Sequence, residues 1–213
     1  MRPSLSNRAL QTFIITLGAL PAALLVVSAL TDGLGANPVE QVTHTTGDWA
    51  LRFLLLSLAV TPLRRLLGWS WAAPLRRTLG LTAFGYACCH YLTYLGLEHF
   101  FDWRLIVEDV LERCYVTAGF AAFLCLVPLA VTSTRAMIRR LGRRWVSLHR
   151  LVYLAAALGV IHFLWLVKSD LREPLLYAAV LSLLLGLRLW FRLARSRTRK
   201  ATPNEAESQL SRV

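Results

Sequence analysis

Several apolar stretches of this chain are each close to the length that a helix needs to cross a lipid bilayer. A bilayer-spanning helix requires about 20 predominantly apolar residues, and here 56% of the 213 residues are hydrophobic. Helices are favoured in lipid because they pair every backbone polar group within one segment. The sequence therefore predicts an all-α, polytopic membrane protein. Its six spans are expected near residues 10–30, 47–67, 79–99, 114–132, 148–168 and 174–193.

The predicted spans leave little sequence for any other domain. Their connections are short, so we expect one six-helix bundle over residues 1–193, followed by a basic, disordered cytoplasmic tail over residues 194–213. We see no internal repeat, which disfavours a transporter built from duplicated halves. The chain has no P-loop, no glycine-rich dinucleotide fingerprint and no room for a nicotinamide-binding domain. Any electrons would have to come from a separate donor.

Lysine and arginine are distributed unevenly between the loops on the two sides of the predicted bundle. Short loops rich in these residues remain in the cytoplasm. Of the 24 Lys and Arg residues, the loops on one side hold only Arg52, Arg104, Arg113, Lys168 and Arg172. We therefore expect a multi-pass protein with both termini in the cytoplasm. The net charge of +12 follows from this topology signal and from contact with lipids, and no nucleic-acid partner is expected.

The four cysteines form no motif associated with metal binding or haem attachment. Neither a CxxC spacing nor a CxxCH sequence occurs. We interpret the cysteines as small apolar residues that pack between helices. Any haem in this protein would be held by histidine and not attached covalently.

Two histidines fall at a similar depth within the predicted spans. Ionisable side chains at membrane depth are costly and usually functional. His90 lies roughly 17 Å of helix rise into the third span, and His162 lies roughly 21 Å into the fifth span, which runs in the same direction. Each could offer one imidazole to a haem held between the two helices. The alternative is that each histidine only packs and hydrogen-bonds within the bundle.

A third histidine lies nearer to the predicted cytoplasmic surface. His149 is about 20 Å of rise from His162, so the two cannot share one iron. This position suggests a second redox station near the inner surface. Arg76 and Arg77, at the start of the third span, suit haem propionates, a flavin phosphate or a lipid phosphate as partners. Simple anchoring to lipid headgroups is the alternative for these two arginines.

The remaining two histidines are expected on the opposite side of the membrane. His44 could help to dock a partner or act as a polar group where electrons leave, although ordinary placement at the membrane interface is the alternative. His99 precedes Phe100 and Phe101, a pattern typical of an interfacial aromatic belt.

Eight segments together resemble the MsrQ (YedZ) family of haem-binding membrane subunits. The resemblance covers roughly residues 10–193, and its motifs are specific in combination. They are Gly35-Ala-Asn-Pro38-Val-Glu40, His44-Thr-Thr-Gly47-Asp-Trp49, Thr61-Pro62-Leu63, Arg76-Arg77-Thr-Leu-Gly80, Thr132-Ser133-Thr, Trp145-Val-Ser-Leu-His149-Arg-Leu-Val-Tyr153, His162-Phe-Leu-Trp165-Leu-Val-Lys168 and Glu173-Pro174-Leu. The resemblance implies a ferric-reductase-like transmembrane domain in the bacterial inner membrane.

The same resemblance implies cofactors and partners. One or two haem b groups and FMN would carry electrons from quinol or a cytoplasmic flavin reductase to MsrP. MsrP is the periplasmic molybdoenzyme that reduces methionine sulfoxide in envelope proteins. This chain would then be the electron-transfer subunit and not the catalytic subunit.

The family's histidines match His90, His149 and His162. In the wider superfamily two histidine pairs bind two haems, whereas here Arg76 occupies the inner position on the third span. His149 would then have an atypical partner, or would lie beside flavin or quinone.

Two other classes of function remain open at this point. A related ferric reductase or cytochrome b-like oxidoreductase would share the haem. A cofactor-free membrane scaffold or transporter would use the histidines only for packing.

Overall fold

The computed structural model describes residues 5–31, 33–167 and 170–201, and within them the chain is helical with no strand. The all-α prediction is therefore confirmed. Asp32, Lys168 and the tail beyond Ala201 lie outside the described residues. The long helices are α1 (Leu5–Leu30), α2 (Pro38–Leu67), α3 (Leu75–Thr93), α5 (Cys114–Val131), α8 (Leu151–Leu166) and α9 (Arg172–Ala201). The short ones are η1 (Ser70–Ala72), η2 (Tyr94–Glu98), α4 (Trp103–Glu112), α6 (Arg135–Leu141) and α7 (Arg143–Leu148).

Each long helix contains most of one predicted span, with differences at the ends. The predicted third span ends as a π-helix, η2. The helix α8, which holds most of the predicted fifth span, begins only after the short helix α7. α9 continues past the predicted end of its span at residue 193, so the first part of the predicted disordered tail is helical. Within the described residues, four segments are long and apolar enough to cross a membrane, namely Ala9–Leu30, Cys114–Val131, Arg143–Leu166 and Arg172–Ala194. α2 and α3 are not among them, and the count of six spans remains a prediction.

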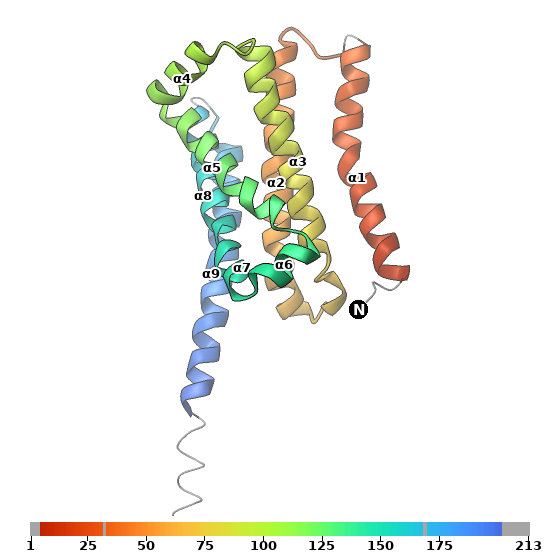
Figure 1. The fold of residues 1–213 in the computed structure, drawn as a ribbon, viewed down its shortest axis with the longest axis vertical. Helices are drawn as coiled ribbons and strands as arrows, with labels where there is room; N and C mark the ends of the chain where they lie inside the picture. The colour runs from red at the N-terminus through yellow and green to blue at the C-terminus, as the bar shows by residue number, and fades with distance from the viewer. Residues whose placement is uncertain (1–4, 32, 168–169, 202–213) are drawn as a thin grey trace, which may run out of the picture.

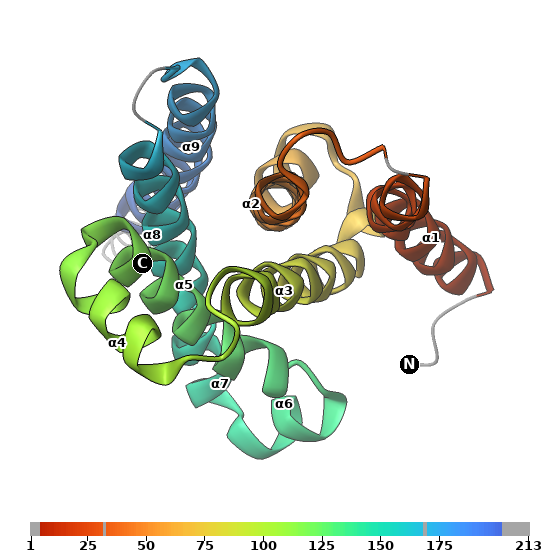
Figure 2. The ribbon, with the colours of Figure 1, turned by 90° about the horizontal axis from the view of Figure 1, so that it is seen from above.

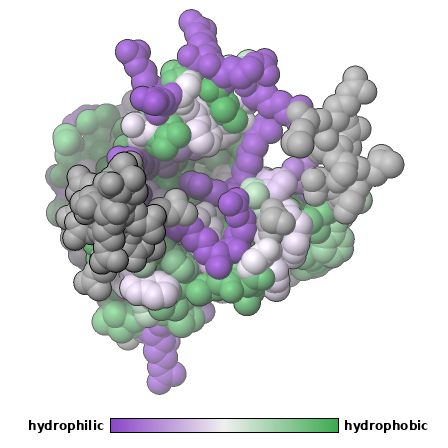
Figure 3. All heavy atoms as spheres, turned by 90° about the horizontal axis from the view of Figure 1, so that it is seen from below, coloured by the Kyte–Doolittle hydropathy of each residue, from purple (hydrophilic) through white to green (hydrophobic). Residues whose placement is uncertain are grey.

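The basic connections lie together at one end of the molecule (Figure 1). The start of α1, the α2–α3 connection, helices α6 and α7 and the end of α9 share this end, which we call the basic end. Figure 3 views it from below and shows hydrophilic side chains gathered there. The exposed arginines of this end include Arg64, Arg65, Arg77, Arg135, Arg139, Arg140, Arg143, Arg144 and Arg150. The alternating direction of the helices agrees with the charge pattern in the sequence.

Two helix pairs form the centre of the bundle. α2 packs along α3, α5 packs along α8, and these are the most extensive helix contacts in the described part of the chain. α9 lies against α2 and α8, and α1 lies at the edge against α3 and α2 (Figure 2). Ala83 of α3 and Ala155 and Ala156 of α8 are almost completely buried. Small residues of this kind let helix backbones approach closely in membranes.

One buried tyrosine of α3 hydrogen-bonds to the backbone of α1. The Tyr86 hydroxyl donates a hydrogen bond to the Gly18 carbonyl at 2.7 Å and accepts one from the Ala22 amide at 3.1 Å. It thus bridges two backbone groups next to Pro21, where the helical hydrogen-bond ladder is interrupted. Most large apolar side chains of α1 are exposed, Leu24 among them. This exposure suits a helix that faces lipid.

Candidate metal-binding site between two histidines

A cavity of about 850 Å³ lies between the two central helix pairs and beneath α4. Its volume falls within the range of about 300–1,000 Å³ that is usual for ligand-binding pockets. Most of its lining is apolar or aromatic, including Leu51, Leu54, Ala87, Phe120, Phe123, Leu126 and Phe163. His90 and His162 are the polar side chains in its middle, and charged residues such as Glu40 and Asp48 lie toward the end opposite the basic one. The space therefore suits a large, mostly apolar ligand.

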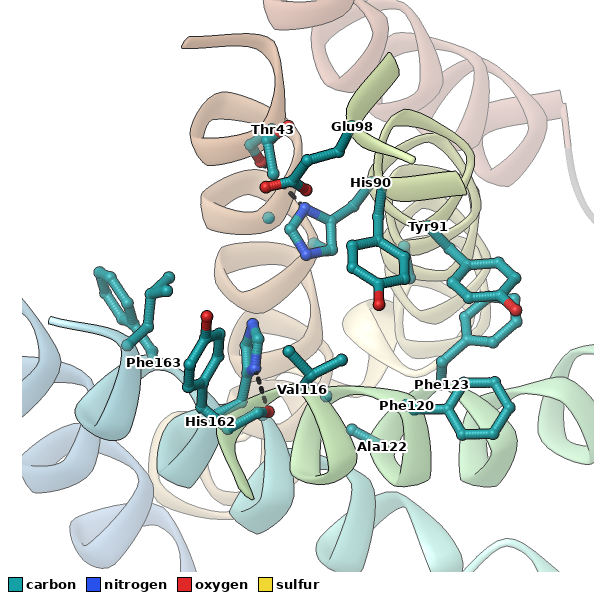
Figure 4. A pocket seen from close by; sticks show the side chains of 18 of the residues that line it. Thr43, His90, Tyr91, Glu98, Val116, Phe120, Ala122, Phe123, His162 and Phe163 are labelled. Carbon is teal, nitrogen blue, oxygen red and sulfur yellow. Dashed lines mark hydrogen bonds between the residues drawn. The ribbon is translucent and has the colours of Figure 1, made fainter. Parts of the chain in front are cut away.

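The two histidines are held in the same way by carbonyl groups of neighbouring helices. His90 of α3 donates from Nδ1 to the Thr43 carbonyl of α2 at 2.9 Å. His162 of α8 donates from Nδ1 to the Tyr115 carbonyl of α5 at 2.7 Å. A carbonyl can only accept, so each Nδ1 carries the proton and each Nε2 keeps a free lone pair. Figure 4 shows the second nitrogens of the two rings facing each other across the cavity.

The separation of the two rings fits a single metal ion between them. Their centroids are 6.1 Å apart, and their planes are inclined by 76°. A metal–imidazole bond is about 2 Å long and a ring nitrogen lies about 1 Å from the ring centre, so two imidazoles on one metal have centres about 6 Å apart. The separation would therefore allow both Nε2 atoms to bind one metal ion.

No third ligand accompanies this pair. Among the described residues there is no group of three or more His, Cys, Asp or Glu side chains that could hold a metal ion. Two imidazoles alone do not complete a zinc-type site, which uses three or four protein ligands. They do suffice for haem, whose porphyrin supplies the four other ligands of its iron. The donor set and the size of the cavity thus fit haem better than a bare metal ion.

The third predicted site histidine lies outside this cavity. The ring of His149 stacks on Trp145 with a centroid distance of 3.8 Å, and its Nδ1 lies 3.2 Å from the Trp145 carbonyl oxygen. Its Nε2 is buried without a hydrogen-bond partner in the described part of the chain. Arg76 lies within electrostatic range of His149, whereas Arg77 is exposed to solvent. The structure therefore separates a His90–His162 pair from a His149–Arg76 region.

A partly buried arginine that was not singled out from the sequence lies near Arg76. Arg188 of α9 donates from Nη1 to the Tyr153 hydroxyl at 2.7 Å and from Nη2 to the Leu58 carbonyl. It also lies within electrostatic range of Arg76 and Arg65. The apolar residues on both sides of Arg188 in the sequence could have indicated a partly buried position.

A second polar cluster joins α4 to the rest of the site. Asp109 of α4 is buried, accepts a hydrogen bond from the Tyr94 hydroxyl at 3.0 Å and forms an ion pair with Arg113, whose Nε lies 2.8 Å away. His99 Nε2 lies 3.5 Å from the same carboxylate, and its ring packs edge-on against Tyr94. His99 is therefore part of a cluster with Asp109 and Tyr94, and its placement in an interfacial belt stays a prediction. The cluster holds α4 over the cavity.

His44 lies at the rim of the cavity. Its side chain is exposed, and its Nε2 is 3.8 Å from Glu40. The four cysteines are free, and Cys89 and Cys114 are exposed, so close packing between helices does not account for these two.

Comparisons with known proteins identify relatives of the whole bundle. The model of the ferric reductase like transmembrane component family matches residues 46–160, which include His90 and end two residues before His162. A relative from Rhodospirillum rubrum is 56% identical over 169 residues, covering 79% of this chain and 81% of its own. The chain belongs to the MsrQ family. The matched family model describes a transmembrane component, and several helices of this chain are long and apolar enough to cross a membrane, as expected for a multi-pass membrane protein.

Other members of the MsrQ family match over more of the chain. One from Xanthomonas euvesicatoria is 48% identical over 213 residues, covering 96% of this chain and 98% of its own. One from Herminiimonas arsenicoxydans is 50% identical over 175 residues, covering 81% of this chain and 80% of its own. These relatives are named as heme-binding subunits of protein-methionine-sulfoxide reductase. The resemblance seen in the sequence motifs is confirmed.

Proposed function

We propose that this chain is a haem b electron-transfer subunit of a methionine sulfoxide reductase system. It would take electrons from quinol or a cytoplasmic flavin reductase and pass them across the inner membrane to a periplasmic molybdoenzyme of the MsrP type. The observation that carries this proposal is the pair of imidazoles 6.1 Å apart inside an apolar cavity. The relatives named as heme-binding subunits give the same indication.

The residues around the cavity have separate roles in this proposal. A bound haem would supply one-electron redox chemistry at its iron. His90 and His162 would hold it through Nε2, while the carbonyls of Thr43 and Tyr115 fix the ring tautomers and make the ligands more basic. The apolar walls exclude water and lower the local dielectric, and both effects tune a reduction potential.

A second station near the basic end is also part of the proposal. His149, Arg76 and Arg77 would serve a second haem, FMN or quinone, with the arginines near a carboxylate or phosphate group of that cofactor. The unpaired Nε2 of His149 and the proximity of Arg76 support this role. Arg188 adds a further positive charge to the same region.

The direction of electron flow rests on the charge pattern. The basic end would face the cytoplasm, because loops rich in arginine are retained there. The cavity reaches the opposite end beside Glu40 and Asp48, which would then face the periplasm and the partner enzyme. Electrons would enter near His149 and leave from the cavity.

The first test is the dithionite-reduced minus oxidised absorption spectrum of the purified protein, normalised by haem content. We expect a low-spin b-type spectrum that is lost in His90→Ala and in His162→Ala. His44→Ala is the control, since His44 lies at the exposed rim and should leave the spectrum unchanged. Partial loss of haem in His149→Ala would indicate a second haem. A colourless protein after haem-supplemented expression would contradict the proposal and leave a scaffold or transporter.

A second experiment tests the partner. The reduced protein is mixed with the periplasmic molybdoenzyme together with methionine sulfoxide, or with a ferric chelate alone. Reoxidation that depends on the molybdoenzyme supports the proposed system. Equally fast reoxidation by the ferric chelate alone would favour a metal-ion reductase.

A further inference from the structure

The two cavity histidines are held by two copies of one local arrangement. In each copy a carbonyl accepts from the histidine Nδ1, and both hydrogen bonds span 47 residues of sequence. In each copy a glycine lies one helical turn after the carbonyl residue on the same helix, Gly47 after Thr43 and Gly119 after Tyr115. The arrangement of carbonyl, glycine and histidine in the α2–α3 pair thus recurs in the α5–α8 pair, although we saw no repeat in the sequence.

Each glycine lies against one histidine ring, Gly47 against His90 and Gly119 against His162. A Cβ atom added at Gly119 would lie 2.8 Å from Nδ1 of His162, closer than real Cβ contacts allow. A Cβ atom added at Gly47 would lie 3.1 Å from Nδ1 and Cε1 of His90, which is tight. The absence of a side chain at these two positions lets each ring lie against the neighbouring helix and reach its carbonyl.

Backbone conformation does not explain either glycine. The positive-φ glycines of the described chain are Gly35, Gly68 and Gly142, so Gly47 and Gly119 have ordinary helical backbone. Glycine is less favourable than alanine inside a helix. The contact with the histidine ring is therefore the feature that requires glycine at these positions.

We propose that Gly47 and Gly119 are positioning residues that set the ring planes of His90 and His162 as metal ligands. This inference rests on the proposed haem binding. Each carbonyl fixes the direction of one Nδ1–H bond, and each glycine fixes how deeply the ring sits against the helix. The two carbonyl–glycine pairs are on different helices, α2 and α5, and the planes of the two rings are inclined by 76°. The angle between axial imidazole planes affects the electron paramagnetic resonance spectrum of a ferric haem, so it can be measured directly.

The test compares three glycine-to-alanine variants of the full-length, haem-loaded protein. Gly119→Ala should weaken haem retention about 10-fold or more, as loss of ligand-orienting contacts typically does. Gly47→Ala should have a smaller effect, because its contact is less severe. Both should shift the largest g value of the ferric spectrum. The control is Gly85→Ala, an exposed position of α3 where an added Cβ meets no atom within 4 Å. Wild-type spectra and retention in both site variants would overturn the proposal.

A pair of double variants covers the case in which a single variant does not accumulate. If the alanine Cβ acts by colliding with the ring, Gly119→Ala combined with His162→Ala should accumulate as a folded apoprotein. Gly47→Ala combined with His90→Ala should behave likewise. If neither double variant accumulates as a folded protein, the glycines serve only helix packing. A wild-type protein without haem would instead count against the proposed function, so the two failures are distinguishable.

Discussion

Arg188 lies in an apolar stretch of α9 and has no carboxylate partner among the described residues. A charged group out of water is costly unless hydrogen bonds satisfy it. Here the Tyr153 hydroxyl and the Leu58 carbonyl accept from the two Nη atoms, and the Tyr153 ring lies 5.2 Å from the guanidinium carbon. Nε is buried without a hydrogen-bond partner in the described part of the chain. The residue therefore links α9 to α8 and α2 near the His149–Arg76 region.

Removing one partner of this arginine should destabilise the bundle. We expect Tyr153→Phe to cost about 1–3 kcal/mol, the range for leaving a buried polar group without its partner. Tyr115→Phe is the comparison, since it removes a hydroxyl bonded to the more exposed Arg113 and should cost less. Thermal unfolding in detergent measures both. Equal losses in the two variants would show that burial of Arg188 is not the cause.

At the level of single residues, the sequence indicated only part of the site. His90 and His162 could be selected because ionisable residues at matched membrane depth are rare. Their carbonyl partners could not be selected, because a backbone oxygen has no signature in the sequence and its position depends on how two helices pack. Gly47 and Gly119 were missed for the same reason.

Among the elements, α4 is the one that covers the cavity. Its N-terminus is capped by Asp102, whose side chain accepts from the amides of Arg104 and Leu105. It follows the π-helix η2, and such segments occur frequently at functional sites. Ile106 and Asp109 are its buried side chains, so its attachment depends on few contacts.

Weakening the Asp109 cluster should loosen α4 without unfolding the bundle. Asp109→Asn removes the charge that Arg113 and Tyr94 contact. We expect faster amide hydrogen exchange in residues 103–112 and unchanged exchange in α5 and α8. Glu108→Gln is the matched control, because Glu108 is exposed on the same helix. Faster exchange throughout the bundle in Asp109→Asn would contradict a local role.

The long helices were predictable because each contains an apolar run of membrane length. The short helices α4, α6 and α7 were not predicted, since they are brief polar or amphipathic segments that resemble loops in composition. The extension of α9 to Ala201 was missed because charged residues replace apolar ones there, although arginine and lysine are good helix formers.

At the centre of the whole molecule, two helix-pair units, α2–α3 and α5–α8, meet at the cavity. One unit contributes His90 and the other His162, and the helix contacts within each unit are more extensive than those between them. A metal bound by both histidines would therefore join the two units.

The charge asymmetry gives a prediction for the whole molecule. We expect both termini in the cytoplasm. A green fluorescent protein fused to the C-terminus should be fluorescent, and alkaline phosphatase fused there should be inactive. The same phosphatase fused after Asp102, near the opposite end, should be active. An active C-terminal phosphatase fusion would reverse the predicted orientation.

The placement of one histidine in each unit also bears on biosynthesis. His90 is synthesised and inserted into the membrane well before α8 emerges from the ribosome with His162. On the proposed ligation, a growing chain has only one axial ligand to offer until α8 has been inserted beside α5. Capture of the cofactor would then occur late and would mark chains whose membrane insertion has progressed as far as α8.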